Sequence, residues 1–462
     1  MRFRSLLSVL AVTGLLASVV FAAETTGSIS GIVKGRDGAP LPGVTVTVSG
    51  PYLPAGRTDY TDSAGRFQFA RLLPGEYVVK ASLEKLGSWQ RSAIVAVGKD
   101  TQLDAMLETR TTEAIEVSAA LPLVDLKSTE VAQNFTREQF EKLPMGRTYK
   151  DLFQLSPGVA DNPNRINVNA GGNREDNLFL YDGVNITNPF YADIVTNFTQ
   201  YDIQEINIKQ GAVTAEFGRT GGFVVNAITK SGTNQFHGEV GGDLQKKSFS
   251  ANYSNGTLGS TTDRYAGGVG LGGPIFKDFV WFYGSGSLVR STAGDRTNNF
   301  NVISGSSDPP TDLPDLKVDT DEYFGKLTSA PSPKFFLNAS YRYRKATTKN
   351  AGICSTCAPS VGEDDFTKNE VLTAGATWFL TQNAFAEVKY NRYREDNGFT
   401  APLDFGYRPT FNAQRPDLMG QFVTVTPYLV GGTRVIGQTV GGTSLAKNDD
   451  NFKRDEVKTS VT

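Results

Sequence analysis

Few residues of this sequence have the types and spacing that catalysis or metal binding requires. His237 is the only histidine among 462 residues, so a Ser/His/Asp triad or a histidine-based zinc site would have to include it. It lies in a run of alternating polar and apolar residues, where a polar side chain facing a lumen is the simpler interpretation. We therefore predict no catalytic residue, no metal site and no cofactor.

The only two cysteines are Cys354 and Cys357, separated by two residues in a polar stretch. Two thiols alone cannot fill a four-ligand zinc site. In an exported protein this spacing favours a local disulfide, with redox activity as the alternative.

Two glycine pairs and the charge balance bear on phosphate and nucleic-acid binding. Gly171-Gly172 and Gly221-Gly222 lack the strand-to-helix setting of a phosphate-binding loop. The formal net charge is −2 and no run of basic residues occurs, so no nucleic-acid partner is expected.

The elements around these residues are expected to be mainly β-strands in several domains, because 48 glycines, 29 phenylalanines and 17 tyrosines accompany a 39% hydrophobic composition. Arg2 and Arg4 precede an apolar run over 6–21 and a small-residue cleavage pattern at Ala22. Residues 1–22 are predicted to be a signal peptide; a membrane anchor is the alternative, although the run is shorter than the roughly 20 residues that a span requires.

Residues 24–110 are predicted to form a small β-sandwich. Residues 28–33 and 44–48 are strand-like, and turn signals such as Asp37-Gly38 separate the candidate strands. The segment resembles the carboxypeptidase regulatory-like domain in a series of short motifs, which are Gly31, Pro42-Gly43, Gly65-Arg66-Phe67 and Pro74-Gly75-Glu76-Tyr77. The resemblance implies a seven-stranded, carbohydrate-binding-like fold that either binds glycan or acts as a spacer; peptidase activity is not implied, because the zinc-binding His/Glu set is missing.

Residues 124–235 contain three motifs in a fixed order, and this segment resembles the plug domain of TonB-dependent outer-membrane receptors. The motifs are Leu152 with Ser156-Pro157-Gly158-Val159, then Tyr181-Asp182-Gly183-Val184, and then Ile203, Ile206, Ile208, Gly211, Phe217-Gly218, Gly221-Gly222 and Ile228-Thr229-Lys230. One departure is that the Ile-Arg-Gly frequent in the family is replaced by the stretch 168–172. The resemblance implies a compact α+β unit.

Two short helices are expected to open this unit. Thr136 and Gln139 have the spacing of a capping box. A second helix capped by Thr148 would place Tyr149, Leu152 and Phe153 on one face, where they would belong to the core.

The linker 111–123 carries a candidate TonB box. In receptors of this kind such a peptide adds a strand to TonB, which is energised by its inner-membrane partners, and strand addition needs alternation rather than exact residues. The last strand of the sandwich is the alternative interpretation. The candidate residues are Glu113, Ala114, Ile115, Glu116, Val117, Ser118 and Ala119.

Residues 236–462 alternate in the manner of a transmembrane β-barrel, with a soluble β-protein as the alternative. Seven strands are predicted, within 236–245, 265–275, 279–288, 322–330, 335–344, 371–380 and 384–394. Tight turns at 277–278, 331–333 and 381–383 alternate with long polar loops at 246–263, 290–321 and 345–370.

The number of strands is too small for a complete barrel. About 22 strands of about ten residues, as the resemblance implies, would occupy nearly all of 236–462 before any loop is counted. An open barrel would expose unpaired strand edges to lipid. The expected fold is therefore mainly β and multidomain, with a sandwich, an α+β plug and an incomplete antiparallel barrel. We expect an N-terminal portion of a longer receptor, or a truncated gene product unable to insert alone.

The function that this resemblance implies is energy-coupled uptake across the outer membrane, with the sandwich and TonB box in the periplasm. Siderophore, oligosaccharide and peptide all remain open as the small ligand. A periplasmic or surface carbohydrate-binding scaffold is the alternative. Candidate ligand-facing residues are Asn162, Asn164, Arg165, Asn185 and Asn188.

Overall fold

The computed structural model describes most of the chain. The described residues are 25–84, 86–107, 131–143, 148–157, 159–161, 168–170, 176–188, 198–210, 217, 220–251, 261–298, 311–353, 362–381, 384–400, 428–430, 433–435 and 447–461.

The N-terminal unit is a two-layered β-sandwich, as predicted. One layer has the strand order β4-β1-β7, with β8 also paired to β1, and the other has the order β3-β2-β5-β6. Because β7 and β8 both pair in parallel with successive parts of β1, they act as one interrupted strand. The strands are β1 (Gly27–Gly35), β2 (Thr45–Gly50), β3 (Leu53–Tyr60), β4 (Arg66–Leu72), β5 (Gly75–Leu83), β6 (Gly87–Val95), β7 (Asp100–Gln102) and β8 (Ala105–Leu107).

The sandwich has a core of its own. Alternate residues of β1 are buried, as expected for a strand with one face on a core. Ile29, Val33, Val46, Phe69 and Val79 are all fully or almost fully buried within this cluster. The unit therefore contains the packing that an independent domain needs.

The plug is a second unit, built around the five-stranded sheet β13-β12-β15-β14-β9. Strand β12 pairs in parallel with β15, whereas β14 pairs in an antiparallel manner with both β15 and β9. Its strands are β9 (Val131–Thr136), β12 (Leu178–Tyr181), β13 (Val184–Asn185), β14 (Ile203–Gln210) and β15 (Phe223–Thr229), with the separate pair β10 (Val159–Asp161) and β11 (Val168–Ala170).

Both helices expected in the plug are present, although the second differs in type. Helix α2 (Arg137–Glu141) follows Thr136, whose N–H donates to Gln139 Oε1 at 2.9 Å as the capping-box spacing predicts. The second element, η1 (Lys150–Leu155), is a 3₁₀ helix that begins after Tyr149, not an α-helix capped by Thr148. Thr148 donates its backbone N–H to the Asp151 side chain at 3.0 Å, and the 3₁₀ turn is formed by backbone bonds from Asp151 to Thr148 at 3.2 Å and from Leu152 to Tyr149 at 3.3 Å.

The C-terminal part forms an eight-stranded antiparallel sheet, which we call the wall. The order β16-β17-β18-β21-β22-β23-β24-β27 follows the sequence, so each strand lies beside the next one along the chain. The strands are β16 (His237–Gln245), β17 (Thr262–Phe276), β18 (Val280–Ala293), β21 (Leu316–Ser332), β22 (Phe335–Ala351), β23 (Glu363–Phe379), β24 (Phe385–Thr400) and β27 (Lys447–Val461). Shorter elements are β19 (Thr297–Asn298), β20 (Thr311–Asp312), β25 (Tyr428–Val430), β26 (Thr433–Val435) and η3 (Lys247–Phe249).

All seven predicted wall strands are confirmed, but the prediction missed β27 and made three connections too long. Strands β18, β21, β22 and β23 continue well into the segments predicted as the loops 290–321 and 345–370, and β17 begins inside 246–263. Polar composition marked these residues as loops, yet a strand ladder is held by backbone hydrogen bonds and can continue beyond the apolar zone.

The two faces of the wall differ as the alternation predicted. Val240, Val269, Tyr323 and Val457 are exposed on one face. On the other face, polar side chains such as Arg342 are buried against the plug. This is the arrangement of a lipid-facing outer surface and a polar lumen.

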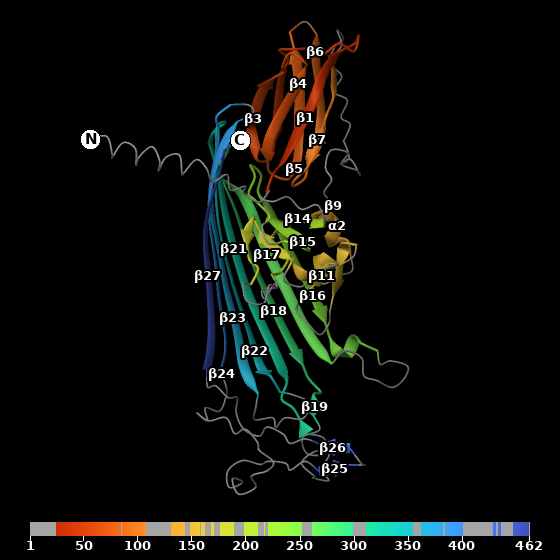
Figure 1. Cartoon of the computed structure of the whole chain (residues 1–462), viewed down its shortest axis with the longest axis vertical. Coiled ribbons are helices and arrows are strands. Elements are labelled where there is room, and N and C mark those ends of the chain that lie inside the picture. Colours follow the sequence, from red (N-terminus) through yellow and green to blue (C-terminus); the bar gives the residue numbers. More distant parts are fainter. Residues whose placement is uncertain are drawn as a thin grey trace, which may run out of the picture.

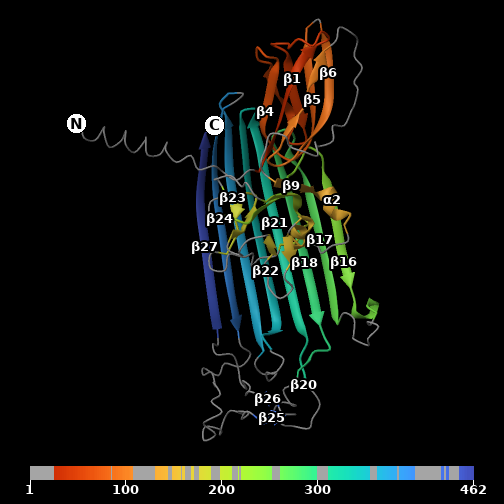
Figure 2. The ribbon, with the colours of Figure 1, turned by 45° about the vertical axis from the view of Figure 1, so that its right-hand side comes forward.

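The three units lie in a defined order in space. Figure 1 shows the plug beside the middle of the wall and the sandwich at one end of it, and the view in Figure 2 agrees. The short turns of the wall lie at the sandwich end, and the short strands β19, β25 and β26 lie at the opposite end. Among the described residues, no helix is long and apolar enough to cross a membrane.

Candidate functional site

The Tyr181-Asp182-Gly183-Val184 motif forms the tight turn between β12 and β13. Tyr181 pairs with Val184, and the two residues between them both have positive φ values, 48° for Asp182 and 79° for Gly183. Two consecutive positive φ values are typical of a type I′ hairpin turn, for which Asp-Gly is a favoured pair. The motif therefore has a direct structural cause.

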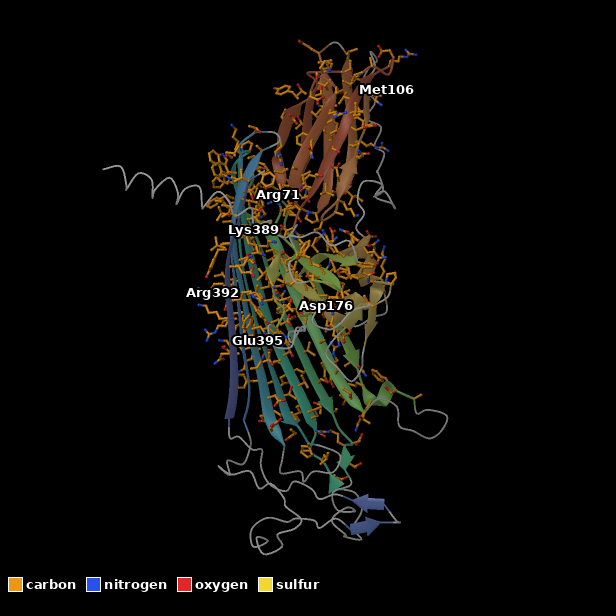
Figure 3. All side chains as sticks on the ribbon, in the orientation of Figure 1. Arg71, Met106, Asp176, Lys389, Arg392 and Glu395 are labelled. Carbon is orange, nitrogen blue, oxygen red and sulfur yellow. The ribbon has the colours of Figure 1, made fainter. Side chains whose placement is uncertain are left out.

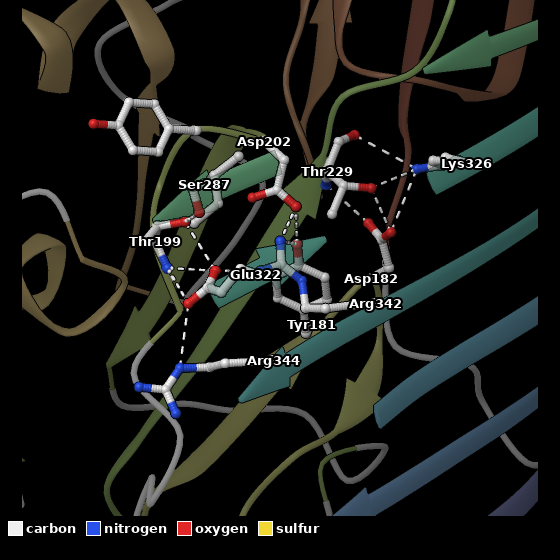
Figure 4. A network of polar contacts seen from close by, with 12 residues as sticks. Tyr181, Asp182, Thr199, Asp202, Thr229, Ser287, Glu322, Lys326, Arg342 and Arg344 are labelled. Carbon is white, nitrogen blue, oxygen red and sulfur yellow. Dashed lines mark hydrogen bonds and ion pairs between the residues drawn. The ribbon is translucent and has the colours of Figure 1, made fainter. Parts of the chain in front are cut away.

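Asp182 also ties this turn to its surroundings. Its Oδ1 accepts the backbone N–H of Thr229 at 2.9 Å, and its Oδ2 accepts the Thr229 hydroxyl at 2.5 Å. Lys326 of wall strand β21 lies 3.4 Å from the same Oδ2 and donates to the Thr229 hydroxyl oxygen at 2.8 Å. The turn is thereby joined both to β15 and to the wall (Figure 4).

Arg342 of β22 is the central cation of the plug–wall contact. It is 2% exposed and forms an ion pair with Asp202 of the plug. It also bonds to the Tyr181 hydroxyl oxygen, and its guanidinium lies 4.5 Å from the ring centroids of both Tyr181 and Phe198. Burial raises the pKa of Tyr181 well above its ordinary value, so its hydroxyl stays protonated and donates to Asp202 Oδ2 at 2.5 Å.

Glu322 of β21 provides the matching anion on the wall. It accepts the backbone N–H and the hydroxyl of Thr199, at 3.0 and 2.8 Å for Oε2. Arg342 lies 3.0 Å from one of its oxygens and Arg344 lies 3.2 Å from the other. We call the set Asp182, Thr199 and Asp202 of the plug with Glu322, Lys326 and Arg342 of the wall the plug–wall latch (Figure 4).

The latch is polar on both sides, and this decides what it can do. Breaking a buried ion pair by removing one partner is costly because the other charge stays buried without compensation. If the two surfaces separate, water can hydrogen-bond to the same charged and polar groups. Separation of an apolar contact would instead expose apolar surface to water. The latch can therefore hold the plug firmly at rest and still allow a hydrated interface to open.

A second polar contact lies where the plug joins the first wall strand. Glu239 of β16 pairs with both Arg137 and Lys230, and Tyr283 donates to it at 2.8 Å. Burial is the main cause that lowers the pKa of Lys230 to about 8, and the neighbouring Arg137 adds to it. Glu239 thus pairs with two plug cations, of which Arg137 also pairs with Glu141 at 2.5 Å.

Glycines of the wall allow the plug to approach closely. A Cβ at Gly268 would lie 2.7 Å from the ring of Tyr201, and one at Gly241 would lie 3.1 Å from it. Only a residue without a side chain leaves room for this ring. Glycine-rich β16 and β17 are therefore shaped to receive Tyr201.

The sandwich joins the plug through a buried carboxyl. Glu205 of β14 accepts the backbone N–H of Val97 at 2.9 Å and a bond from Asn134, whose amide also donates to the Val97 carbonyl at 2.9 Å. Burial raises the pKa of Glu205 to about 7, although these hydrogen bonds favour its ionised form. We call Val97, Asn134 and Glu205 the sandwich–plug joint.

The structure brings together only part of the predicted site. Gly221-Gly222 packs over Asp176, with the Gly222 N–H donating to its carbonyl at 2.9 Å. Pro157 accepts a bond from Gln210 at 2.9 Å. These contacts lie inside the plug and give the motif a structural role.

The two described residues that were expected to face a ligand lie against the wall. The Asn185 carbonyl accepts from Arg454 at 2.8 Å. Asn188 is 6% exposed, and its amide lies 3.4 Å from Glu395. Neither contact points to a ligand, and a ligand-facing role for them stays a prediction.

Several predicted residues lie outside the described part of the chain. They are Glu113, Ala114, Ile115, Glu116, Val117, Ser118, Ala119, Gly158, Asn162, Asn164, Arg165, Gly211, Gly218, Cys354 and Cys357.

The sequence prediction missed most of the latch. Asp182 was selected as part of the plug motif, but Thr199, Asp202, Glu322, Lys326 and Arg342 were not selected. The available signal was a charged residue at an inward position of an alternating strand. Within the described ranges, no group of three or more His, Cys, Asp or Glu side chains could hold a metal ion.

Comparison with known proteins agrees with this architecture. The model of the carboxypeptidase regulatory-like domain matches residues 28–108, and that of the TonB-dependent receptor plug domain matches residues 125–224. Residues 125–224 thus match a TonB-dependent receptor plug domain, and the chain as a whole resembles the TonB-dependent receptors in its plug, its wall and their order.

Two curated proteins and one solved structure illustrate the similarity. The chain is 27% identical to the TonB-dependent transporter Oar of Myxococcus xanthus, over 72% of this chain and 32% of that protein. It is 26% identical to the probable TonB-dependent siderophore receptor PirA of Acinetobacter baumannii, over 48% of this chain and 31% of that protein. The fold matches the outer membrane transporter YddB from Escherichia coli with a TM-score of 0.51 at 17% identity, covering 71% of this chain and 45% of that one. The chain thus spans about a third of the length of these curated relatives.

Proposed function

We propose that this chain acts in the outer membrane as part of a receptor for TonB-coupled uptake of a small ligand. The observation that carries the proposal is the plug–wall latch, in which Asp182 and Asp202 of a folded plug bind Lys326 and Arg342 on the polar face of a lipid-compatible wall. A plug held by polar groups blocks passage at rest and can be released by a mechanical pull without any catalytic step in this chain.

We propose that TonB applies its force to the linker before the plug. A segment from Glu113 to Ala119 would add a strand to TonB, and the strain would reach β9, the first strand of the plug along the chain. The ligand class stays open between siderophore, oligosaccharide and peptide. The carbohydrate-binding alternative gains no support from the relatives, which are named as a transporter and a siderophore receptor.

Crosslinking in cells tests the TonB contact. Ile115→Pro removes a backbone donor and prevents strand pairing, so crosslinking of this segment to TonB should be lost. Ile115→Val is the matched control, because it keeps the donor and a strand-favouring side chain. Equal crosslinking of the proline variant and the wild type would contradict the proposed contact.

Cell fractionation tests the location. An antibody against residues 24–235 should detect a heat-modifiable band in the outer-membrane fraction. A band well above the 49.9 kDa of this chain would show that a longer receptor contains it. A soluble periplasmic band would overturn the membrane proposal.

A further inference from the structure

A cavity of about 260 Å³ lies between the sandwich and the short turns of the wall. Tyr52, Leu53 and Leu72 line it from the sandwich. Phe279 and Phe379 are among the aromatic residues that line it from the wall. Its lining is mainly apolar. We call it the joint cavity, because it lies where the sandwich meets the wall.

Positive charge is in excess around the joint cavity. Arg57, Arg71 and Lys389 line it together with the carboxylates of Asp278 and Glu387. Glu387 interacts with two of these cations: it pairs with Arg71 and lies 3.3 Å from Lys389. Figure 3 shows Arg71 and Lys389 near the junction of sandwich and wall.

The arginines have capacity for a further acceptor. The Arg71 Nε atom is buried without a hydrogen-bond partner among the described residues. Arg57 donates to the Ala70 carbonyl at 2.7 Å, and its guanidinium lies 4.2 Å from the ring centroid of Phe379. Burial lowers the pKa of Arg57 to about 10, which leaves it charged at neutral pH inside a largely apolar lining. Asp59 compensates this charge in part, and an anionic group in the cavity would compensate it further.

The aromatic side of the cavity continues onto the outer face of the wall. Phe279 and Phe335 both line the cavity and are 45% and 41% exposed. Phe335 stacks on Trp378, which is also exposed, with 5.6 Å between ring centroids. Together with exposed Phe276 they form an aromatic band at the sandwich end of the wall. Such bands lie at the level of lipid headgroups in transmembrane barrels.

We propose that the joint cavity binds an anionic phospholipid from the membrane leaflet next to the sandwich. Part of one acyl chain would enter between Leu53 and Phe279, and the phosphate would face the cationic side chains of Arg57 and Arg71, which both line the cavity. Because the lining of the joint cavity is continuous with the aromatic band, a membrane lipid is the occupant that fits this position. The inference rests on the proposed membrane location, and the lipid would connect the sandwich to the wall beside the contacts of Arg71.

Native mass spectrometry of the full-length protein purified in detergent tests the proposal. Dioleoyl phosphatidylglycerol, dioleoyl phosphatidylcholine and free oleate are added in separate titrations. The wild type should retain phosphatidylglycerol in preference to both others. Retention of oleate alone would overturn the phospholipid assignment, and equal retention of the two phospholipids would overturn the role of the arginines.

Two variants and a control locate the site. Arg57→Gln should weaken phosphatidylglycerol binding about fivefold through the loss of one cation. Ser332→Trp, at the turn that lines the cavity, should abolish binding by filling it. Arg36→Gln removes an equal charge from an exposed position of the same domain and should have no effect. Unchanged binding by Ser332→Trp would refute the site.

Two further measurements distinguish a loss of lipid binding from a loss of folding or a change of location. Thermal unfolding of the purified variants shows whether the sandwich remains folded, and a variant that binds no lipid while unfolding like the wild type supports the site. Fractionation reports the location independently. A protein found in the outer membrane that retains no phosphatidylglycerol would overturn the cavity proposal and leave the proposed function intact.

Discussion

Arg342 of wall strand β22 and Asp202, in the turn just before β14 of the plug, form a buried ion pair between two units. Each side chain is 2% exposed, so neither charge is compensated by water. The pair therefore contributes a buried electrostatic contact to plug docking beside that of Lys326 with Asp182.

Replacing Arg342 with methionine should destabilise the docked plug by about 3–5 kcal/mol, because Asp202 would remain buried without its partner. The measurement is hydrogen exchange of β12 and β14 in protein purified in detergent. Arg392→Met is the matched control: Arg392 pairs with Asp455 at 43% exposure, and such a pair contributes at most about 1 kcal/mol.

A double variant checks the cause of that loss. Asp202→Leu with Arg342→Met removes both charges and should recover much of the lost protection. If the double variant is no more protected than Arg342→Met, then an uncompensated charge is not the reason for the destabilisation.

Replacing Gly268 with alanine should displace the plug from β17, because the new Cβ would lie within 2.9 Å of three ring atoms of Tyr201. A cost of about 1–3 kcal/mol is expected for such overpacking. Limited proteolysis of the plug provides the measurement. Gly325→Ala is the control, since a Cβ there meets nothing within 4 Å, and equal protease sensitivity of the two variants would contradict the role of Gly268.

The sandwich–plug joint should weaken as the pH rises. Glu205 has a pKa of about 7 when docked, above the ordinary value of about 4.3, so the docked state binds the extra proton between these values. The stability of docking is therefore greatest below about pH 4.3, falls as the pH rises towards 7, and is then constant with respect to this group.

Crosslinking between the sandwich and the plug at pH 5 and pH 8 measures this dependence. Glu205→Gln keeps an oxygen acceptor for Val97 and removes the titration, so its crosslinking should be the same at both pH values. A wild-type protein whose docking does not change with pH would contradict the assignment to Glu205.

The cysteine pair should be oxidised in exported protein. Cys354 and Cys357 are separated by only two residues, so a local disulfide needs no other part of the fold. Thiol alkylation of protein prepared without reductant should modify neither residue. Two alkylated cysteines would disprove the prediction.

Local sequence patterns predicted most of the architecture, because the alternation of polar and apolar residues within a strand shows which side chains share a face. The alternation within 335–344 predicted strand β22, and the capping-box spacing of Thr136 and Gln139 predicted the start of α2. The sequence prediction missed strand β27 because charged residues lie on both of its faces. The position of this strand is set by backbone pairing with β24.

The partners within the latch could not be predicted in the same way. Asp202 and Arg342 are far apart in the sequence, and their contact depends on how two sheets dock. The joint at Glu205 likewise requires a loop of the sandwich to reach β14. Periodicity assigns a side chain to a face but contains no information about what covers that face.

The edge position of β9 has a mechanical consequence. Six residue pairs join it to β14, and it has no second neighbour among the strands that the structure describes. Tension applied ahead of Val131 would load these pairs from one end, so they would separate one after another and not all at once. Asn134 of the same strand holds the Val97 carbonyl. Peeling β9 away would therefore break the bond to the Val97 carbonyl in the same movement, while Glu205 of β14 would keep the Val97 N–H and the other four strands could keep their pairing.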